Sequence, residues 1–293
     1  MNRVSPRVLA LLTLLTLVWG TNWPLFKIAL DELPVFTFRT MVLAAGCAML
    51  AVILRVRGDS FAVPAGKWPA LIAAAAMNMF VWQIATSLAV LYIPSGHASV
   101  LAYTMPLWVA LISFVAFGQR LTGRLLAAIL IGAAAVLALM LPNFQSYERA
   151  PAGLFWGLFA GFCWAVGTFI VKRTSWPGMG LSLTFWQIAI SLPPVALGAL
   201  LIDGLPDHWP SAQALAATIY TGAIPNALGT AAWFALVKLL PAQVAALSSI
   251  AIPIVAIVSG VLLLHEPLSA LQTLAIASTV ISLWLALVPG RAR

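Results

Sequence analysis

Residues 125–141 read LLAAILIGAAAVLALML, an apolar run without a charged or hydrogen-bonding side chain. A helix of about 20 such residues spans the hydrocarbon core of a bilayer. The rest of the chain continues this pattern, because 63% of its 293 residues are hydrophobic and only 8% are charged. A soluble domain carries about 25% charged residues, so the composition predicts an integral membrane protein and excludes a disordered one.

Charges, prolines and glycines divide the whole chain into ten apolar runs of membrane-spanning length. The runs do not alternate between polar and apolar residues as the strands of a membrane barrel would. We therefore predict an all-α integral membrane protein with ten transmembrane helices. Their expected bounds are 8–28, 34–54, 68–91, 96–118, 122–141, 152–172, 181–202, 211–238, 241–264 and 269–289.

The basic residues indicate how the helices are oriented. With the N-terminus in the cytoplasm, most of the 15 Lys and Arg residues fall in cytoplasmic connections, and most of the 7 acidic residues fall outside. Positively charged connections remain in the cytoplasm during insertion. An even number of spans then places both termini there, and the basic excess requires no nucleic-acid partner.

Prolines recur at a constant spacing along the chain. Pro94 and Pro106 return as Pro241 and Pro253. We therefore expect two five-helix repeats, 1–145 and 146–293, within one membrane domain. Because five is an odd number of spans, the second repeat must be inverted in the bilayer. Inverted repeats are typical of transporters, whose substrate site lies near the midplane.

Polar and aromatic side chains inside the expected spans are the candidates for a substrate site. A polar group at membrane depth must be hydrogen-bonded or wet, so it faces either a cavity or a neighbouring helix. Aromatic faces stack on the apolar parts of ligands, and side-chain amides form hydrogen bonds with the polar groups of ligands. The substrate-binding candidates are Trp19, Asn22, Trp23, Asn78, Trp82, Gln83, Tyr103, Trp164, Thr168, Trp186, Gln187, Asn226 and Trp233.

Charged residues narrow the chemistry further. No acidic residue lies in the middle of an expected span, although a cation/proton exchanger usually needs a buried carboxylate. Lys27 and Arg39 are candidate gate or charge residues. Arg39 could bind a carboxylate, reach the outer interface, or pair with Asp31 or Glu32. That charged group lacks a histidine or a nucleophile, so an enzyme is disfavoured.

Two further patterns concern helix shape and packing. Pro106 and Pro253 lie in the middle of equivalent expected spans, where each removes a helix hydrogen bond and predicts a static kink or a hinge. Gly153, Gly157 and Gly161 are spaced four residues apart, which permits close helix approach. We expect this packing within a monomer rather than between copies.

Residues 19–23 (WGTNW), followed by Lys27, resemble the first helix of EamA-type proteins in the drug/metabolite transporter superfamily. The mid-helix Pro253 and residues 265–268 (HEPL) are also similar to that family. The chain departs from it at residues 118–121 (GQRL), where the family usually has Gly-Glu-x-Leu.

The resemblance implies a ten-helix exporter, most similar to the YddG-type bacterial exporters of aromatic and other neutral amino acids. It implies a central cavity between the first four helices of each half, with helices 5 and 10 behind them. We therefore expect a transporter of the bacterial inner membrane that exports neutral, aromatic or other apolar amino acids and similar metabolites by alternating access. The alternative is a broad-specificity drug or sugar-related metabolite exporter. The expected partners are a small-molecule substrate and the lipid bilayer, without cofactor or metal, and the expected state is a monomer.

Overall fold

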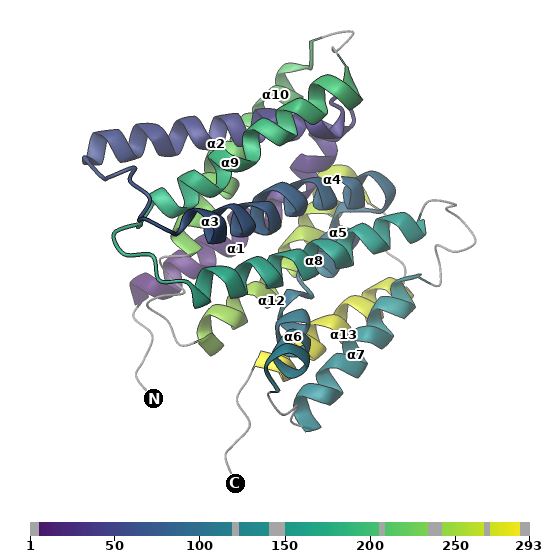
Figure 1. Ribbon diagram of the computed structural model, residues 1–293. Coiled ribbons are helices and arrows are strands. Elements are labelled where there is room, and N and C mark those ends of the chain that lie inside the picture. The colour runs from purple at the N-terminus through teal and green to yellow at the C-terminus, as the bar shows by residue number, and fades with distance from the viewer. Residues whose placement is uncertain are drawn as a thin grey trace.

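A computed structural model of the chain describes residues 6–118, 123–140, 150–204, 209–233, 242–266 and 270–287. The secondary structure of these ranges is helical, with ten helical segments joined by short connections (Figure 1). Pro241 and most of residues 118–121, which were used in the sequence comparison of the two halves and with the family, lie outside the described residues.

The first half contributes five segments. They are α1 (Pro6–Leu30); α2 (Val35–Arg57); α3 (Trp68–Ala75) with η1 (Ala76–Val81) and α4 (Trp82–Tyr92); α5 (Ser95–Ala102) with α6 (Met105–Phe117); and α7 (Gly123–Met140). The bounds of these segments lie close to those of the expected apolar runs, because the charged residues and prolines that interrupt the apolar runs also lie at the ends of the helices.

The second half repeats this order. Its segments are α8 (Ala150–Arg173); α9 (Ser182–Gly198) with η2 (Ala199–Asp203); α10 (Ala212–Thr221) with η3 (Gly222–Gly229); α12 (Ala242–Leu264); and α13 (Ala270–Leu287). The elements named η are π-helical, so their turns are wider than those of an α-helix.

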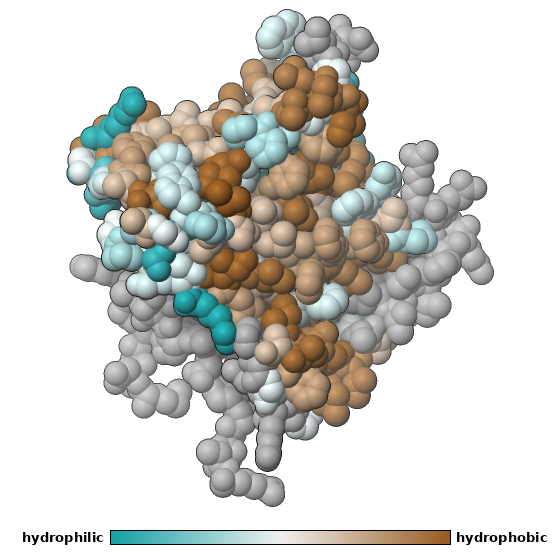
Figure 2. Space-filling model, viewed as in Figure 1, coloured by the Kyte–Doolittle hydropathy of each residue, from teal (hydrophilic) through white to brown (hydrophobic). Residues whose placement is uncertain are grey.

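The outer surface of the bundle is suited to lipid. Among the described residues, five stretches are long and apolar enough to cross a membrane: 35–57, 68–92, 95–116, 151–173 and 182–203. Large apolar side chains such as Val56, Val115 and Leu201 are mostly exposed. Figure 2 shows hydrophobic residues over the middle of the visible face and hydrophilic ones at the edge near the α2–α3 connection. An apolar surface of this extent needs a lipid or protein partner.

The main contacts between the described helices keep their pattern when the two halves are exchanged. α1 packs on α12, and the equivalent α8 packs on α5 and α6. α4 packs on α8, and the equivalent α10 and η3 pack on α1. α2 packs on η3, and the equivalent α9 packs on α3 and η1. Three further pairs join equivalent helices: α2 with α9, α5 with α12, and α7 with α13, which lie side by side at one edge of the bundle (Figure 1). This exchange symmetry is what duplicated halves produce.

The third and eighth segments carry π-helical turns at equivalent places, η1 and η3. Pro225 lies inside η3, where it has no backbone N–H to donate. Gly222 begins η3 against α2, and a Cβ added there would clash with the Val42 carbonyl oxygen. Glycine is therefore required for the close approach of these two elements.

The fourth segment is broken rather than bent. α5 ends at Ala102 and α6 begins at Met105, so Pro106 lies in the first turn of α6 and not in mid-helix as the sequence predicted. The proline ring would clash with the carbonyl four residues earlier, that of Ala102, and the chain turns at Tyr103 before it. Pro253, by contrast, lies inside the continuous helix α12.

The glycine spacing on α8 serves packing within one chain. A Cβ added to Gly157 would lie 2.8 Å from the Leu101 side chain, and one added to Gly161 would lie 2.8 Å from the Ala102 carbonyl oxygen. The glycines therefore bring α8 against α5, directly beside the break.

Carboxylates join the two halves at one face of the bundle. Asp203, at the end of η2, accepts hydrogen bonds from the Thr37 backbone N–H at 2.6 Å and the Thr37 hydroxyl at 2.9 Å. Glu32 accepts from the Ser211 backbone N–H and hydroxyl, each at 2.6 Å. Both carboxylates therefore cap a helix of the opposite half, where free N–H groups and the helix dipole favour negative charge.

Glu266 makes a third contact of this kind, because its Oε1 accepts from the Ser95 N–H at 2.7 Å at the start of α5. We call this side the acidic face; it holds Asp31, Glu32, Asp203 and Glu266. The opposite side of the bundle is the basic face, which holds Arg55 and Arg57 at the end of α2, Lys67 before α3, and Lys172 and Arg173 at the end of α8. There Leu71, Met179 and Leu183 pack the α8–α9 connection against α3.

Candidate substrate cavity

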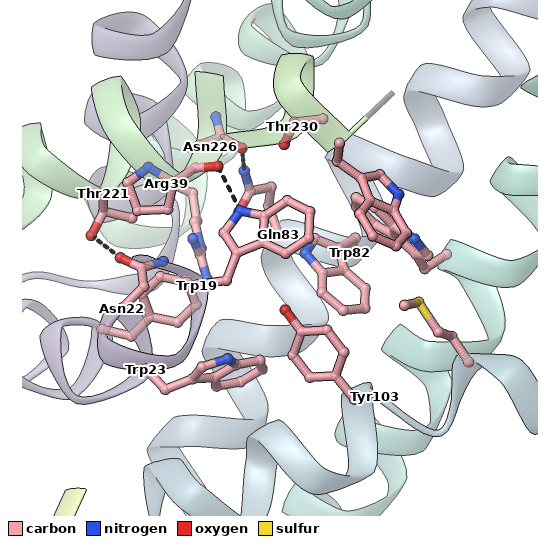
Figure 3. Close-up of a pocket in the computed structure, with 15 residues that line it drawn as sticks. Trp19, Asn22, Trp23, Arg39, Trp82, Gln83, Tyr103, Thr221, Asn226 and Thr230 are labelled. Carbon is pink, nitrogen blue, oxygen red and sulfur yellow. Dashed lines mark hydrogen bonds between the residues drawn. The ribbon is translucent and has the colours of Figure 1, made fainter. Parts of the chain in front are cut away.

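A cavity lies between the two halves (Figure 3). The centres of water molecules can occupy about 60 Å³ of this cavity, which is room for a few waters. A larger molecule therefore requires side chains of the wall to move. The lining residues are Trp19, Asn22, Trp23, Phe26, Arg39, Trp82, Gln83, Tyr103, Met105, Trp164, Thr221, Pro225, Asn226, Thr230 and Trp233.

Aromatic rings form much of the wall. Trp82 of α4 and Trp164 of α8 lie with their ring centres 4.7 Å apart, and Trp19 of α1 and Trp233 lie 5.5 Å apart. Each pair joins one ring from each half. Such rings offer flat apolar faces on which an aromatic or aliphatic group can stack.

Hydrogen bonds between polar groups also join the two halves around the cavity (Figure 3). The donors and acceptors are Trp19 Nε1 to the Pro225 carbonyl oxygen at 2.9 Å, Gln83 Nε2 to Asn226 Oδ1 at 2.6 Å, and the Thr221 hydroxyl to Asn22 Oδ1 at 2.8 Å. These bonds satisfy polar groups that would be costly at membrane depth. In each bond a wall oxygen is the acceptor.

Arg39 is completely buried where α2 passes the cavity. Its Nε donates to the Ser87 hydroxyl at 2.6 Å, and its Nη2 donates to the Thr86 hydroxyl at 3.0 Å. The guanidinium carbon lies 4.1 Å from the centre of the Phe26 ring and 4.7 Å from that of Phe38. The hydroxyl acceptors and the ring faces offset part of the cost of burying this charge.

The remaining nitrogen of this group, Nη1, has no hydrogen-bond partner among the described residues. Two of the interpretations left open by the sequence are wrong. Arg39 is too deeply buried to reach the membrane interface, and it does not pair with Asp31 or Glu32. Asp31 pairs instead with Lys27 at 3.1 Å, and Glu32 caps α10.

Most of the substrate-binding candidates meet at this cavity. Those in its lining are Trp19, Asn22, Trp23, Trp82, Gln83, Tyr103, Trp164, Asn226 and Trp233, together with Arg39. The side chains come from spans that are distant in sequence, so their convergence depends on the packing of the two halves.

The other candidates lie elsewhere. Asn78 Nδ2 donates to Gln187 Oε1 at 3.1 Å, and this fully buried pair joins η1 to α9. Trp186 lies toward the basic face, where its Nε1 donates to the Phe61 carbonyl oxygen at 2.7 Å. Thr168 is half-buried on α8 and is not in the lining.

Five lining residues, Phe26, Met105, Thr221, Pro225 and Thr230, were not among the substrate-binding candidates named from the sequence, although Thr230 follows the candidate Asn226 by four residues. Phe26 follows Trp23 by three residues, so the helical face of α1 contained the signal for it. Met105, Thr221 and Pro225 depend on irregular backbone. Met105 follows the break between α5 and α6, and Pro225 lies within η3 with Thr221 just before it.

The chemistry of this site is that of binding. Among the described residues that line the cavity there is no carboxylate, and no cluster of three metal-ligating side chains occurs in the described part of the chain. Membrane-spanning helices in two similar halves around such a cavity are the architecture of a membrane transport protein.

The chain belongs to the EamA-like transporter family, whose family model matches residues 7–141 and again residues 151–288. It is 27% identical over 279 residues to a probable amino-acid metabolite efflux pump of Escherichia coli (strain K12), covering 91% of this chain and 89% of the relative. It is 25% identical over 269 residues to the uncharacterized transporter YvbV of Bacillus subtilis (strain 168), covering 90% and 86%. A solved crystal structure shares the fold, with a TM-score of 0.67 at 20% identity over 96% of both chains.

Proposed function

We propose that this protein exports neutral, aromatic or other apolar amino acids and similar metabolites across the bacterial inner membrane by alternating access, as a monomer. The cavity carries this proposal, because it combines aromatic faces, amides and one buried guanidinium without a carboxylate among its described lining residues. The Escherichia coli relative, a probable amino-acid metabolite efflux pump, supports the substrate class and the direction. The resemblance to YddG-type exporters agrees with it.

The proposed mechanism treats residues 1–145 and 146–293 as inverted repeats. Each half contributes five spans, and an odd number turns the second half over in the bilayer. The exchange symmetry of the packing and the matched π-helical turns η1 and η3 support this relation. Inverted repeats allow two mirror-related conformations that open a central site to opposite sides in turn.

The proposed orientation places the basic face and both termini in the cytoplasm. The acidic face is then external, and the helix caps made by Glu32, Asp203 and Glu266 hold that side together. Opening to the outside would separate these contacts between the halves. The break before Pro106 and the proline in α12, Pro253, are the proposed points of bending.

Transport by the purified protein in liposomes tests the proposal. We expect exchange of labelled phenylalanine, tryptophan and leucine above the level of protein-free liposomes, and inhibition of that exchange by unlabelled neutral amino acids. Repeating the assay with an imposed pH gradient separates facilitated diffusion from proton coupling. Failure to carry these amino acids, with transport of a lipophilic dye or a sugar-related metabolite by the same preparation, would favour the alternative exporter instead.

A further inference from the structure

The cavity holds a buried positive charge that no described residue balances. Arg39 is fully buried, and its Nη1 lacks a hydrogen-bond partner in the described part of the chain. A guanidinium keeps its charge in proteins, and a buried charge without a counter-ion is costly. Its neighbours Ser87, Thr86 and Phe26 supply only hydroxyls and a ring face.

Two fully buried polar atoms of the wall lack a hydrogen-bond partner among the described residues, and both are donors. Besides Arg39 Nη1, the buried Nδ2 of Asn226 has no partner among the described residues. Three oxygens of the wall, in contrast, already accept from the protein's own donors: Asn226 Oδ1 from Gln83, Asn22 Oδ1 from Thr221, and the Pro225 carbonyl from Trp19. A ligand that complements this wall brings hydrogen-bond acceptors and negative charge.

We propose that Arg39 binds the carboxylate of the substrate and that the cavity prefers apolar monocarboxylates over zwitterionic amino acids and over amines. This inference rests on the proposed function, since it takes the cavity as the transport site and narrows the substrate class. The rings of Trp82 and Trp164 receive the apolar part of such an acid. Arg39 receives its charged end.

An ammonium group has no comparable place. The described lining offers it no carboxylate, and it would share a small cavity with the guanidinium of Arg39, where like charges repel strongly. Aromatic faces attract cations, but the face of Phe26 is already occupied by that guanidinium. A zwitterion is therefore accepted less well than an acid of the same shape, and an amine least.

Three ligands with the same phenyl ring and a closely similar chain separate these charges: 3-phenylpropionate, phenylalanine and phenethylamine. Each is tested as an inhibitor of labelled phenylalanine exchange by the full-length protein in liposomes. We expect 3-phenylpropionate to inhibit at a concentration at least about 10-fold below that of phenethylamine, with phenylalanine between them, as loss of a charge-assisted hydrogen bond implies.

Variants then assign the preference to one side chain. Arg39→Gln is expected to weaken inhibition by 3-phenylpropionate about 10- to 100-fold while changing that by phenethylamine much less. Arg55→Gln is the matched control, because Arg55 lies on the same helix but is exposed at the basic face. If Arg39→Gln does not fold, the three ligands tested on the unchanged protein still show whether the cavity prefers an acid over an amine.

The outcomes separate this inference from the proposed function. If phenethylamine inhibits as well as 3-phenylpropionate, or if folded Arg39→Gln keeps the acid preference, the inference is overturned while phenylalanine exchange still supports an amino-acid exporter. If labelled 3-phenylpropionate is carried and phenylalanine is not, the inference stands and the amino-acid part of the proposed function fails. If the folded protein carries neither, both fail.

Discussion

Asn78 and Gln187 show that a polar pair inside membrane spans can serve packing instead of binding. The sequence identified both as substrate-site candidates by the rule that buried polar groups face either a cavity or another helix. That rule cannot choose between its two outcomes for a single residue. The structure pairs them at 3.1 Å between η1 and α9, whereas Asn22 and Asn226 face the cavity. The aromatic and amide residues of the site were therefore predictable as a class, and the destination of each was not.

Asn78→Ala is expected to destabilise the protein by about 1–3 kcal/mol, because it leaves the buried Gln187 oxygen without a donor. The KM for transport should stay unchanged, since neither side chain lines the cavity. Thermal unfolding in detergent and transport in liposomes measure the two effects. Gln213→Ala, at an exposed position, serves as the control. A raised KM at unchanged stability would contradict this packing role.

Trp164→Ala is expected to weaken binding of aromatic substrates by up to about tenfold relative to leucine. The substitution removes one of two facing rings, and stacking contributes about 0.5–1.5 kcal/mol beyond burial. The ratio of the KM values for phenylalanine and leucine measures it. Trp209→Ala is the control, because Trp209 is 93% exposed. An unchanged ratio would remove Trp164 from the aromatic part of the site.

At the scale of elements, the ends of the helices were predictable and their irregularities were not. Apolar runs end where charges and prolines begin, so most of the expected bounds agree with the structure, while the expected boundary at 238–241 lies outside the described residues. Pro106 signalled a disturbance of the fourth span, but its form, a full break at Tyr103 rather than a kink, depends on close packing against Gly161 of α8. The π-helical turns have no signal in apolar periodicity, and they carry Pro225 and Asn226 to the cavity.

Gly222→Ala is expected to cost about 1–3 kcal/mol of stability, because the new Cβ would meet the backbone oxygen of Val42 and force η3 away from α2. The melting temperature in detergent should fall accordingly. Gly123→Ala is the matched control, since no atom lies within 4 Å of a Cβ there. Equal melting temperatures for the two variants would show that the close approach is not required.

Asp203→Ala is expected to destabilise the protein by about 1–2 kcal/mol, because it removes the carboxylate that accepts from Thr37 and caps the start of α2. Asp203→Asn keeps a hydrogen-bond acceptor at this position and should lose less stability than Asp203→Ala. The control is Asp59→Ala, which breaks only a partly exposed pair with Arg57, worth about 0–1 kcal/mol. Similar losses for Asp203→Ala and Asp59→Ala would count against a structural role of the acidic-face caps.

At the scale of the whole molecule, the repeat was readable because its prolines recur, and the family model matches the chain twice. The exchange symmetry of the packing came only with the structure, since it concerns which helices of opposite halves meet. The cavity is a product of that symmetry, because its wall is shared between the halves. The central claim is therefore that a single site between the halves is reached in turn from both sides of the membrane.

Side-specific labelling of introduced cysteines tests this claim most directly. With Cys47 and Cys163 replaced by serine, Met105→Cys places a thiol in the cavity wall, Arg55→Cys one on the basic face, and Gln213→Cys one near the acidic face. We predict that a membrane-impermeant reagent labels Met105→Cys from either side, and more slowly when phenylalanine is present. The same reagent should label Arg55→Cys from one side of the membrane only and Gln213→Cys from the other side only. Labelling of Met105→Cys from one side alone, or of both surface cysteines from the same side, would contradict the account.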